Sequence, residues 1–126
     1  MVNDWELITE SKYDRQKSIW QQGILHKARV LVVGAGTLGN EAIKNLALLG
    51  VGSITIVDND IIEKVNLNRC LLFREEDIGL HKARVAAQRA RELNPDVEVS
   101  YYIADIIFDF GAGFFENFDV VLSCLD

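Results

Sequence analysis

The glycine-rich turn Gly34-Ala35-Gly36-Thr37-Leu38-Gly39 is the feature that most constrains how this chain can fold. It follows the continuous apolar, β-branched run 28–33, which predicts a buried strand. It opens the segment 39–49, whose apolar residues recur at helical spacing, and Gly50 follows as a C-cap. The sequence therefore predicts a strand, a tight turn and a helix in direct succession.

Strand and helix patterns alternate along the rest of the chain. Apolar or alternating runs predict strands at 53–57, 97–103 and 119–122, and amphipathic spacing predicts a helix over 79–93. Two segments are less regular: 58–74 is typical of a long loop or a short helix, and 105–117 of a short, broken helix. The alternation predicts an α/β fold, a Rossmann-like doubly wound and mostly parallel sheet with helices on both faces.

We place this Rossmann-like, nucleotide-binding domain at 28–126 and a loosely helical N-terminal segment, an N-terminal helix, at 1–27. A parallel sheet needs both faces covered and its last strand protected, and a fold of this class is usually half built at such a length. We therefore expect the chain to be a truncated piece of a longer protein, or to complete its core against a partner.

Composition narrows the functional classes. The chain has 126 residues, 49% of them hydrophobic and 25% charged, which is typical of one globular domain. Its net charge of −6 argues against nucleic acid or an anionic membrane as a partner bound through bulk charge. The start of the chain lacks a signal-peptide pattern, and no apolar run approaches the ~20 residues that cross a bilayer, so we expect a cytoplasmic protein.

The glycine turn has the context of a nucleotide-binding motif, because Asp58 ends the next predicted strand about twenty positions further on. Gly34 permits the tight turn, Gly36 lets the backbone approach a phosphate, and Gly39 lets the helix pack closely against the strand. The N–H groups at the helix start, around Thr37 and Leu38, would face the anion. Asp58 can accept hydrogen bonds from ribose hydroxyls.

A plain dinucleotide site does not require the polar residues that follow. Asp60 adds a second carboxylate near the predicted edge of the sheet, and Asn66 and Arg69 follow in the loop. Arg69 offers a planar fork of donors for phosphate oxygens, and Lys82 offers a point charge. Asp126 lies just past a buried strand, at the edge where this architecture binds ligands. Either Asp126 or Asp60 could hold Mg²⁺.

These residues lead to a resemblance that covers nearly the whole chain from Tyr13 onward. The chain resembles the N-terminal half of the adenylating domain shared by ThiF, MoeB, HesA and ubiquitin-activating enzymes. Five segments match that family in order: Tyr13-Asp14-Arg15-Gln16, the turn 34–39, Asp58-Asn59-Asp60 with Asn66-Leu67-Asn68-Arg69, Gly79-Leu80-His81-Lys82-Ala83 with Leu93-Asn94-Pro95, and Ser123-Cys124-Leu125-Asp126. The departures are mild: Lys12, Thr37, Val65 and Cys70 replace the family's usual Arg, Gly, Ser and Gln.

The resemblance implies an ATP- and Mg²⁺-dependent reaction on the C-terminal carboxylate of a ubiquitin-like or sulfur-carrier protein, giving an acyl-adenylate and pyrophosphate. By the same resemblance Asp58 and Asp60 lie in the nucleotide site, with Asp58 on the ribose. Asn66, Arg69 and Lys82 line the phosphates, and Asp126 organises the Mg²⁺. Arg15 matches an arginine that reaches into the partner subunit's site, which implies a homodimer.

Two other functions stay open at this point. An NAD(P)-binding oxidoreductase explains the glycine turn and Asp58 but gives Asp60, Asn66 and Arg69 no role. A non-catalytic subunit that keeps the fold is the other alternative, because the family's carrier-protein groove is absent from these residues. We expect Cys70 and Cys124 to be structural, and His26 and His81 to be surface residues, because neither histidine has a neighbour at metal-ligand spacing.

Overall fold

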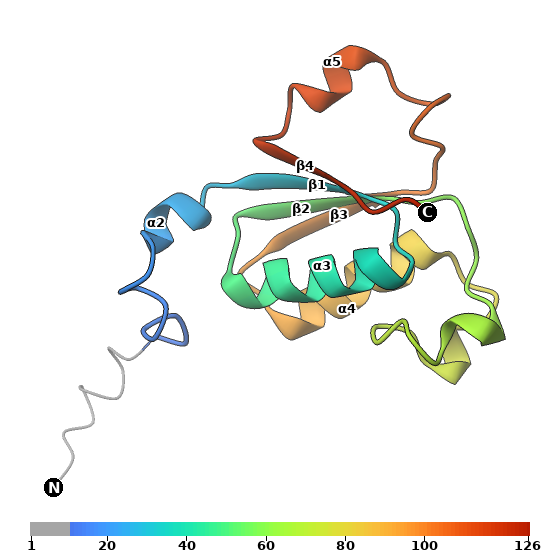
Figure 1. Cartoon of the computed structure of the whole chain (residues 1–126), viewed down its shortest axis with the longest axis horizontal. Helices are drawn as coiled ribbons and strands as arrows, with labels where there is room; N and C mark the ends of the chain where they lie inside the picture. Colours follow the sequence, from blue (N-terminus) through green and yellow to red (C-terminus); the bar gives the residue numbers. More distant parts are fainter. Residues whose placement is uncertain (1–10) are drawn as a thin grey trace, which may run out of the picture.

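A computed structural model of the chain describes residues 11–126. In this part of the chain four parallel strands form one sheet in the order β3-β2-β1-β4 (Figure 1). In chain order the strands are β1 (Arg29–Val33), β2 (Ser53–Val57), β3 (Glu98–Tyr102) and β4 (Val120–Ser123). They lie where the sequence predicts them, to within two residues at each end.

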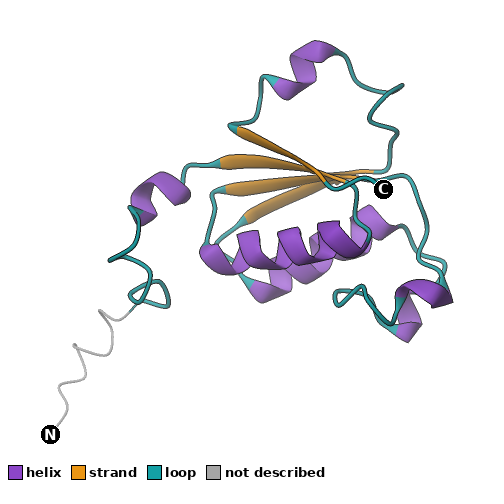
Figure 2. Ribbon diagram, in the orientation of Figure 1, coloured by secondary structure: helices purple, strands orange, loops and turns teal. Residues whose placement is uncertain are grey.

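Helices lie on both faces of the sheet, which confirms the Rossmann-like α/β arrangement. The two long helices, α3 (Thr37–Leu49) and α4 (Lys82–Leu93), cover one face (Figure 2). The other face is covered more thinly, by the short α5 (Ala112–Phe115) and the loops around it. None of the helices in residues 11–126 has the length and apolar character that crossing a membrane requires.

The strand register brings three strand ends to the same level. Val33, the last residue of β1, is paired with Val57 of β2 on one side and with Ser123 of β4 on the other. The chain runs outward from β1 to β2 and β3, and then returns to the far side of β1 as β4. The order therefore reverses beside β1, and open sheets of this kind bind ligands at the carboxyl ends of the strands at that point.

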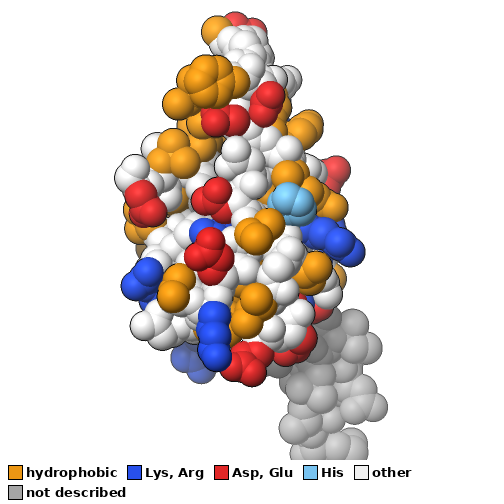
Figure 3. All heavy atoms as spheres, turned by 90° about the vertical axis from the view of Figure 1, so that its right-hand side faces the viewer, with side chains coloured by type: hydrophobic (Ala, Val, Ile, Leu, Met, Phe, Trp, Pro, Cys, Tyr) orange, Lys and Arg blue, Asp and Glu red, His pale blue; other side chains and the backbone are white. Residues whose placement is uncertain are grey.

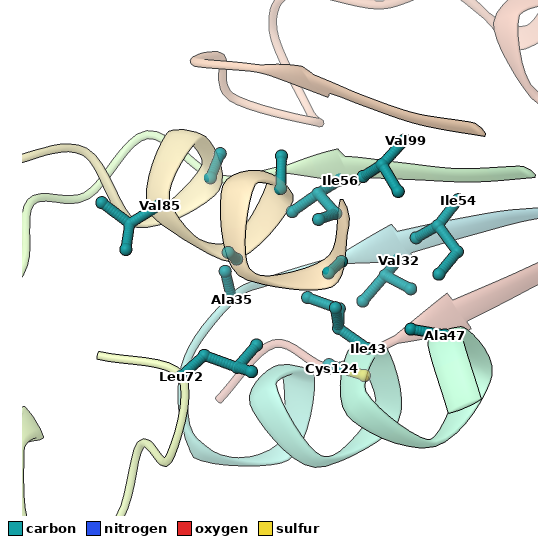
Figure 4. Close-up of a cluster of buried hydrophobic side chains, with 14 of the residues drawn as sticks. Val32, Ala35, Ile43, Ala47, Ile54, Ile56, Leu72, Val85, Val99 and Cys124 are labelled. Atoms are coloured by element: carbon teal, nitrogen blue, oxygen red, sulfur yellow. The ribbon is translucent and has the colours of Figure 1, made fainter. Parts of the chain in front are cut away.

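The main core lies between the sheet and the two long helices. Alternate strand residues point to this face, as the period of two requires. Figure 4 shows them against the helices and neighbouring loops, with a labelled set of Val32, Ala35, Ile43, Ala47, Ile54, Ile56, Leu72, Val85, Val99 and Cys124. Cys124 packs here, which confirms its predicted structural role, and burial raises the pKa of its thiol.

A second, smaller core covers the opposite face of β1 and β2. Leu31, Val33 and Val57 are buried there beneath the phenylalanine-rich segment that contains α5. The rings of Phe110 and Phe114 stack with centroids 4.1 Å apart. Aromatic packing therefore takes the place that a long helix has on the other face.

The N-terminal segment differs, in its described residues, from the helix expected within 1–27. Its described residues form turns, followed by the four-residue helix α2 (Gln22–Leu25). The side-chain amides of Gln16 and Gln22 both donate to the Leu49 carbonyl at the end of α3, at 2.8 and 2.9 Å. These two hydrogen bonds hold the segment against the C-terminal end of α3. Residues 1–10 lie outside the described residues, and the domain boundary at residue 27 stays a prediction.

Asn94 is the centre of a polar network that attaches this segment to the domain. It is 2% exposed, and its Nδ2 donates to Tyr13 Oη and to the Ala47 carbonyl, both at 2.7 Å. Its Oδ1 accepts from Lys12 Nζ at 2.6 Å and from the Asp96 amide at 3.1 Å. The pKa of the Asp96 carboxyl is lowered, first by the hydrogen bond from Lys12 and then by that from the Tyr13 hydroxyl.

We expect Asn94→Ala to lower the free energy of unfolding by about 1–3 kcal/mol, because it removes the buried hydrogen bonds to Tyr13 Oη and to the Ala47 carbonyl. Urea unfolding followed by circular dichroism measures the change. Asn45→Ala, at an exposed position of α3, is the matched control and should stay within about 0.5 kcal/mol of the parent chain. Equal stability of the two variants would contradict the role assigned to Asn94.

Candidate functional site

The turn after β1 has the geometry that its glycines predict. Gly34 has a φ of +101°, and a Cβ at this position would lie 2.7 Å from the Cys124 carbonyl oxygen. A Cβ on Gly39 would lie 1.9 Å from the Gly34 carbonyl oxygen, so α3 can approach the turn only without a side chain here. Gly36 has open space around its Cβ position, which leaves its backbone accessible from outside.

The start of α3 presents unpaired backbone donors. Gly36 is the N-cap of this 13-residue helix and supplies no side-chain cap. Within residues 11–126 the N–H groups of Gly36, Thr37 and Leu38 have no hydrogen-bond partner. Free N–H groups and the positive end of the helix dipole together favour an anion at this position.

Asp58 links the end of β2 to the glycine turn. Its Oδ2 accepts from the Ala35 amide at 2.8 Å, and its Oδ1 accepts from the Asp60 amide at 2.7 Å. The side chain is half-buried, and each oxygen retains lone pairs beyond these bonds. Asp58 therefore shapes the turn and can still accept from a ligand hydroxyl. The sequence did not predict the first of these two functions.

Lys82 and Asp60 are brought together at the same edge of the sheet. The Lys82 amide donates to the Asp60 carbonyl at 3.0 Å, which fixes the start of α4 beside the loop after β2. Lys82 Nζ lies 3.9 Å from Asp60 Oδ2. The lysine side chain is 13% exposed and the aspartate side chain is 70% exposed, so the ammonium group lies at the end of a mostly covered stem.

Asn66 and Arg69 lie in the loop between β2 and α4, around the short 3₁₀ helix Lys64–Asn66. Asn66 Oδ1 accepts from the Glu63 amide at 2.8 Å and so closes this turn, which leaves the Asn66 amide donors for other partners. Arg69 is exposed and forms no ion pair with another residue of the described part. Its neighbour Cys70 is buried, with Sγ 3.9 Å from Thr37 Oγ1, so this loop contacts the start of α3.

A cavity of about 160 Å³ lies between the strand ends on the side of the second core. Apolar side chains and three carboxylates line it: Val33, Val57, Asp58, Asn59, Asp60, Ala104, Asp105, Ile106, Ile107 and Leu125. Asp126 follows Leu125 and is exposed. Figure 3 looks onto this end of the sheet, where acidic and basic side chains both reach the surface.

Arg15 is the one predicted site residue that lies away from the others. Its neighbour Gln16 is bonded to Leu49, at the end of α3 opposite the glycine turn. The helix has 13 residues, which makes it about 20 Å long at the usual rise. An arginine side chain cannot span that length, so Arg15 does not reach the glycine turn of its own chain. Figure 1 places the two regions at opposite ends of the domain.

The sequence did not predict the role of Asn40. Asn40 is fully buried and hydrogen-bonded to the glycine turn and to the loop after Arg69. Its signal was a polar residue on the apolar stripe of α3, three positions before Ile43.

His81 was expected on the surface, as His26 is, but it is half-buried, because an antiparallel bridge pairs it with Ile61. Its Nδ1 is buried without a partner among the described residues.

The model of the ThiF family matches residues 8–126, which is nearly the whole chain. The chain belongs to the ThiF family. The matched residues include the glycine turn, the loop with Arg69, Lys82 at the start of α4, and the end of β4.

Curated relatives of this ThiF-family chain include the adenylyltransferase and sulfurtransferase uba4 of Aspergillus fumigatus, 39% identical over 99% of the chain and 27% of the relative. The SUMO-activating enzyme subunit 2 of Dictyostelium discoideum is 41% identical over 81% of the chain and 16% of the relative. The chain thus spans about a quarter or less of the length of these relatives.

Solved structures of E. coli proteins are similar to the chain. MccB, solved with ATP, is 33% identical over 78% of the chain and 32% of that protein, with a TM-score of 0.73. The tRNA N6-threonylcarbamoyladenosine dehydratase TcdA, solved in complex with ATP, is 27% identical over 100% of the chain and 52% of that protein, with a TM-score of 0.84.

The two glycines of the turn make opposite predictions for alanine substitution. Gly39→Ala should destabilise the fold by about 1–3 kcal/mol, because the added methyl group overlaps the Gly34 carbonyl and outweighs alanine's better helix propensity. Gly36→Ala meets open space and should cost no more than about 1 kcal/mol. Thermal unfolding of both variants checks this, and a more stable Gly39→Ala would contradict the close contact.

Proposed function

We propose that this chain forms the ATP-binding part of an adenylation site, which activates the C-terminal carboxylate of a ubiquitin-like or sulfur-carrier protein. The observation that carries the proposal is that free helix N–H groups, Lys82 and the Arg69 loop lie together at the carboxyl ends of the strands. A site for hydride transfer needs the glycine turn and Asp58 but has no need for two added cations.

The phosphate end of the nucleotide would lie at the start of α3. The N–H groups of Gly36, Thr37 and Leu38 would bind phosphate oxygens, as helix N-termini do in general. Lys82 adds a point charge, and Arg69 adds a planar set of donors. The mostly covered side chain of Lys82 supports this role, because a partly desolvated ammonium group interacts more strongly with an anion.

The nucleoside end would occupy the cavity beside Asp58. Its apolar lining, which includes Val33, Val57 and Ile106, suits a base, and the Asp58 carboxylate suits ribose hydroxyls. Asp58 is held by two backbone amides and therefore keeps one orientation toward the cavity. The ATP complexes of MccB and TcdA support ATP as the nucleotide.

The chemistry needs positioning and charge neutralisation. An oxygen of the ionised substrate carboxylate attacks the α-phosphorus of ATP, a P–O bond to the β-phosphate breaks, and pyrophosphate leaves with the electron pair. The product is an acyl-adenylate, and no general base is required. Arg69 and Lys82 would offset the charge on the phosphate oxygens during the transfer.

Asp126 would hold a Mg²⁺ ion together with the ATP phosphates. Mg²⁺ is usually bound by one or two carboxylates, phosphate oxygens and water, so one exposed carboxylate at this edge fits that donor set. When bound, the ion would neutralise phosphate charge. Asp60, whose carboxylate lies nearer Lys82, would instead balance the ammonium group.

The proposal places the protein in the cytoplasm. Both cysteines, Cys70 and Cys124, are free and buried, which fits a reducing compartment. The relatives named as a sulfurtransferase and a SUMO-activating subunit support a carrier or modifier protein as the substrate class.

The central test is a calorimetric titration of the chain with ATP and Mg²⁺, and separately with NAD⁺. We expect ATP to bind in a Mg²⁺-dependent manner and NAD⁺ to give no heat. Arg69→Ala and Lys82→Ala should each weaken ATP binding about 10- to 100-fold, since each removes a charged hydrogen-bond donor. Binding of adenosine should stay unchanged within about threefold in both variants.

Arg84→Ala is the control for that series, because Arg84 is an exposed cation two positions after Lys82 on α4. It should leave the ATP affinity unchanged. Equal losses of ATP and adenosine in the Arg69 and Lys82 variants would contradict their phosphate roles. Binding of NAD⁺ with no binding of ATP would replace the proposal with a redox enzyme.

We further propose that Arg15 acts on the site of a second copy in a homodimer, because it lies near the end of α3 opposite its own glycine turn and this helix is about 20 Å long. Mixing an Arg15→Ala chain with a Lys82→Ala chain should restore about a quarter of the parent's adenylating activity, since one in four sites is then intact. Pyrophosphate release measures this. A monomer in sedimentation, or no recovery in the mixture, would contradict the role in trans.

A further inference from the structure

Asn40 connects the two segments that would bind phosphate. It lies in the first turn of α3 and is fully buried. Its Nδ2 donates to the carbonyls of Ala35 and Gly36, at 2.9 and 2.8 Å. Its Oδ1 accepts from the Leu72 amide at 3.0 Å, in the loop that carries Arg69. One side chain thus bonds to the glycine turn and to the Arg69 loop at once.

The bonds to the turn fix the direction of its N–H groups. A trans peptide is planar, so its N–H points opposite to its C=O. Asn40 holds the carbonyls of Ala35 and Gly36 toward the interior, and the N–H groups of the same two peptides belong to Gly36 and Thr37. Those N–H groups therefore point away from Asn40, and they are among the donors without a partner in residues 11–126.

The hydrogen bond from the Leu72 amide fixes the position of the loop that carries Arg69. Leu72 lies three positions after Arg69, and Cys70 between them contacts Thr37. Among the described residues, two links therefore join this loop to the start of α3: the contact between Cys70 and Thr37, and the hydrogen bond from Leu72 to Asn40. The side chain of Asn40 is an amide, which offers the donor and the acceptor that these two segments separately require.

We propose that Asn40 is a positioning residue, which aligns the N–H groups of the glycine turn with Arg69 so that both engage the same phosphate group. Asn40 itself is buried behind the turn and touches no ligand. The inference rests on the proposed nucleotide site, but it concerns how two parts of that site are held together. It predicts an energetic coupling between Asn40 and Arg69 that a purely stabilising residue would not have.

A double-mutant cycle measures this coupling through ATP affinity. Arg69→Ala should weaken ATP about 10- to 100-fold in the parent chain and no more than about threefold in the Asn40→Ala background, where the guanidinium is no longer aligned. Lys82→Ala is the matched control, because the Lys82 amide bonds to Asp60 and not to residues 66–73. Its effect should be the same in both backgrounds. Equal effects of Arg69→Ala in the two backgrounds would overturn the proposal.

Amide hydrogen exchange tests the same role without ATP. Asn40→Ala should speed exchange of the hydrogen-bonded amides in both segments, Ala35 in the glycine turn and Cys70 and Phe73 in the loop, whereas Asn45→Ala on the exposed face of α3 should change neither. Should Asn40→Ala fail to fold, Asn40→Ser, which keeps a shorter hydrogen-bonding side chain, takes its place in both measurements. Faster exchange in only one segment, or in neither, would overturn the proposal.

These two measurements separate the inference from the function on which it rests. Failure of the parent chain to bind ATP would refute the proposed nucleotide, and the exchange experiment would still decide whether Asn40 joins the two segments. ATP binding with additive effects in the cycle would keep the proposed function and refute the positioning role.

Discussion

The register of β1 with its two neighbours is the constraint on which the site depends. Because Val33 pairs with both Val57 and Ser123, three strands end at one level, and the chain leaves each of them at the same edge. The glycine turn, Asp58 and the end of β4 are adjacent for this reason, although they come from three distant parts of the sequence. A slip of one residue would turn the buried side chains of β1 to the opposite face.

Close packing then converts that edge into a site. Gly39 lets α3 lie against the Gly34 carbonyl, which directs the start of the helix at the strand ends. The loop after β2 is in turn attached to the helix start by Asn40 and to α4 by the bond between Asp60 and Lys82. Backbone carbonyls and amides make most of these links, so the side chains with chemical roles remain available.

The sequence predicted the strands, the long helices and the end of the sheet at which most candidate residues lie, because each rests on a local pattern. The apolar run of β1, the helical spacing of α3 and the glycines between them need no knowledge of distant residues. The N-terminal segment was predicted less well, since Gln16 and Gln22 bond to Leu49 across the fold. Asn40 was missed for the same reason: its acceptor role depends on Leu72, which a local pattern cannot supply.

The two outer strands of the sheet differ in what they expose. On β3, Glu98 and Ser100 are exposed, and a charge on an edge opposes pairing with another chain. On β4 the exposed apolar residues are Val120 and Val121, 46% and 43% accessible, next to an edge with no strand beyond it in the described residues. Such an edge can template the addition of a further strand, so association of the isolated chain through β4 should increase with protein concentration.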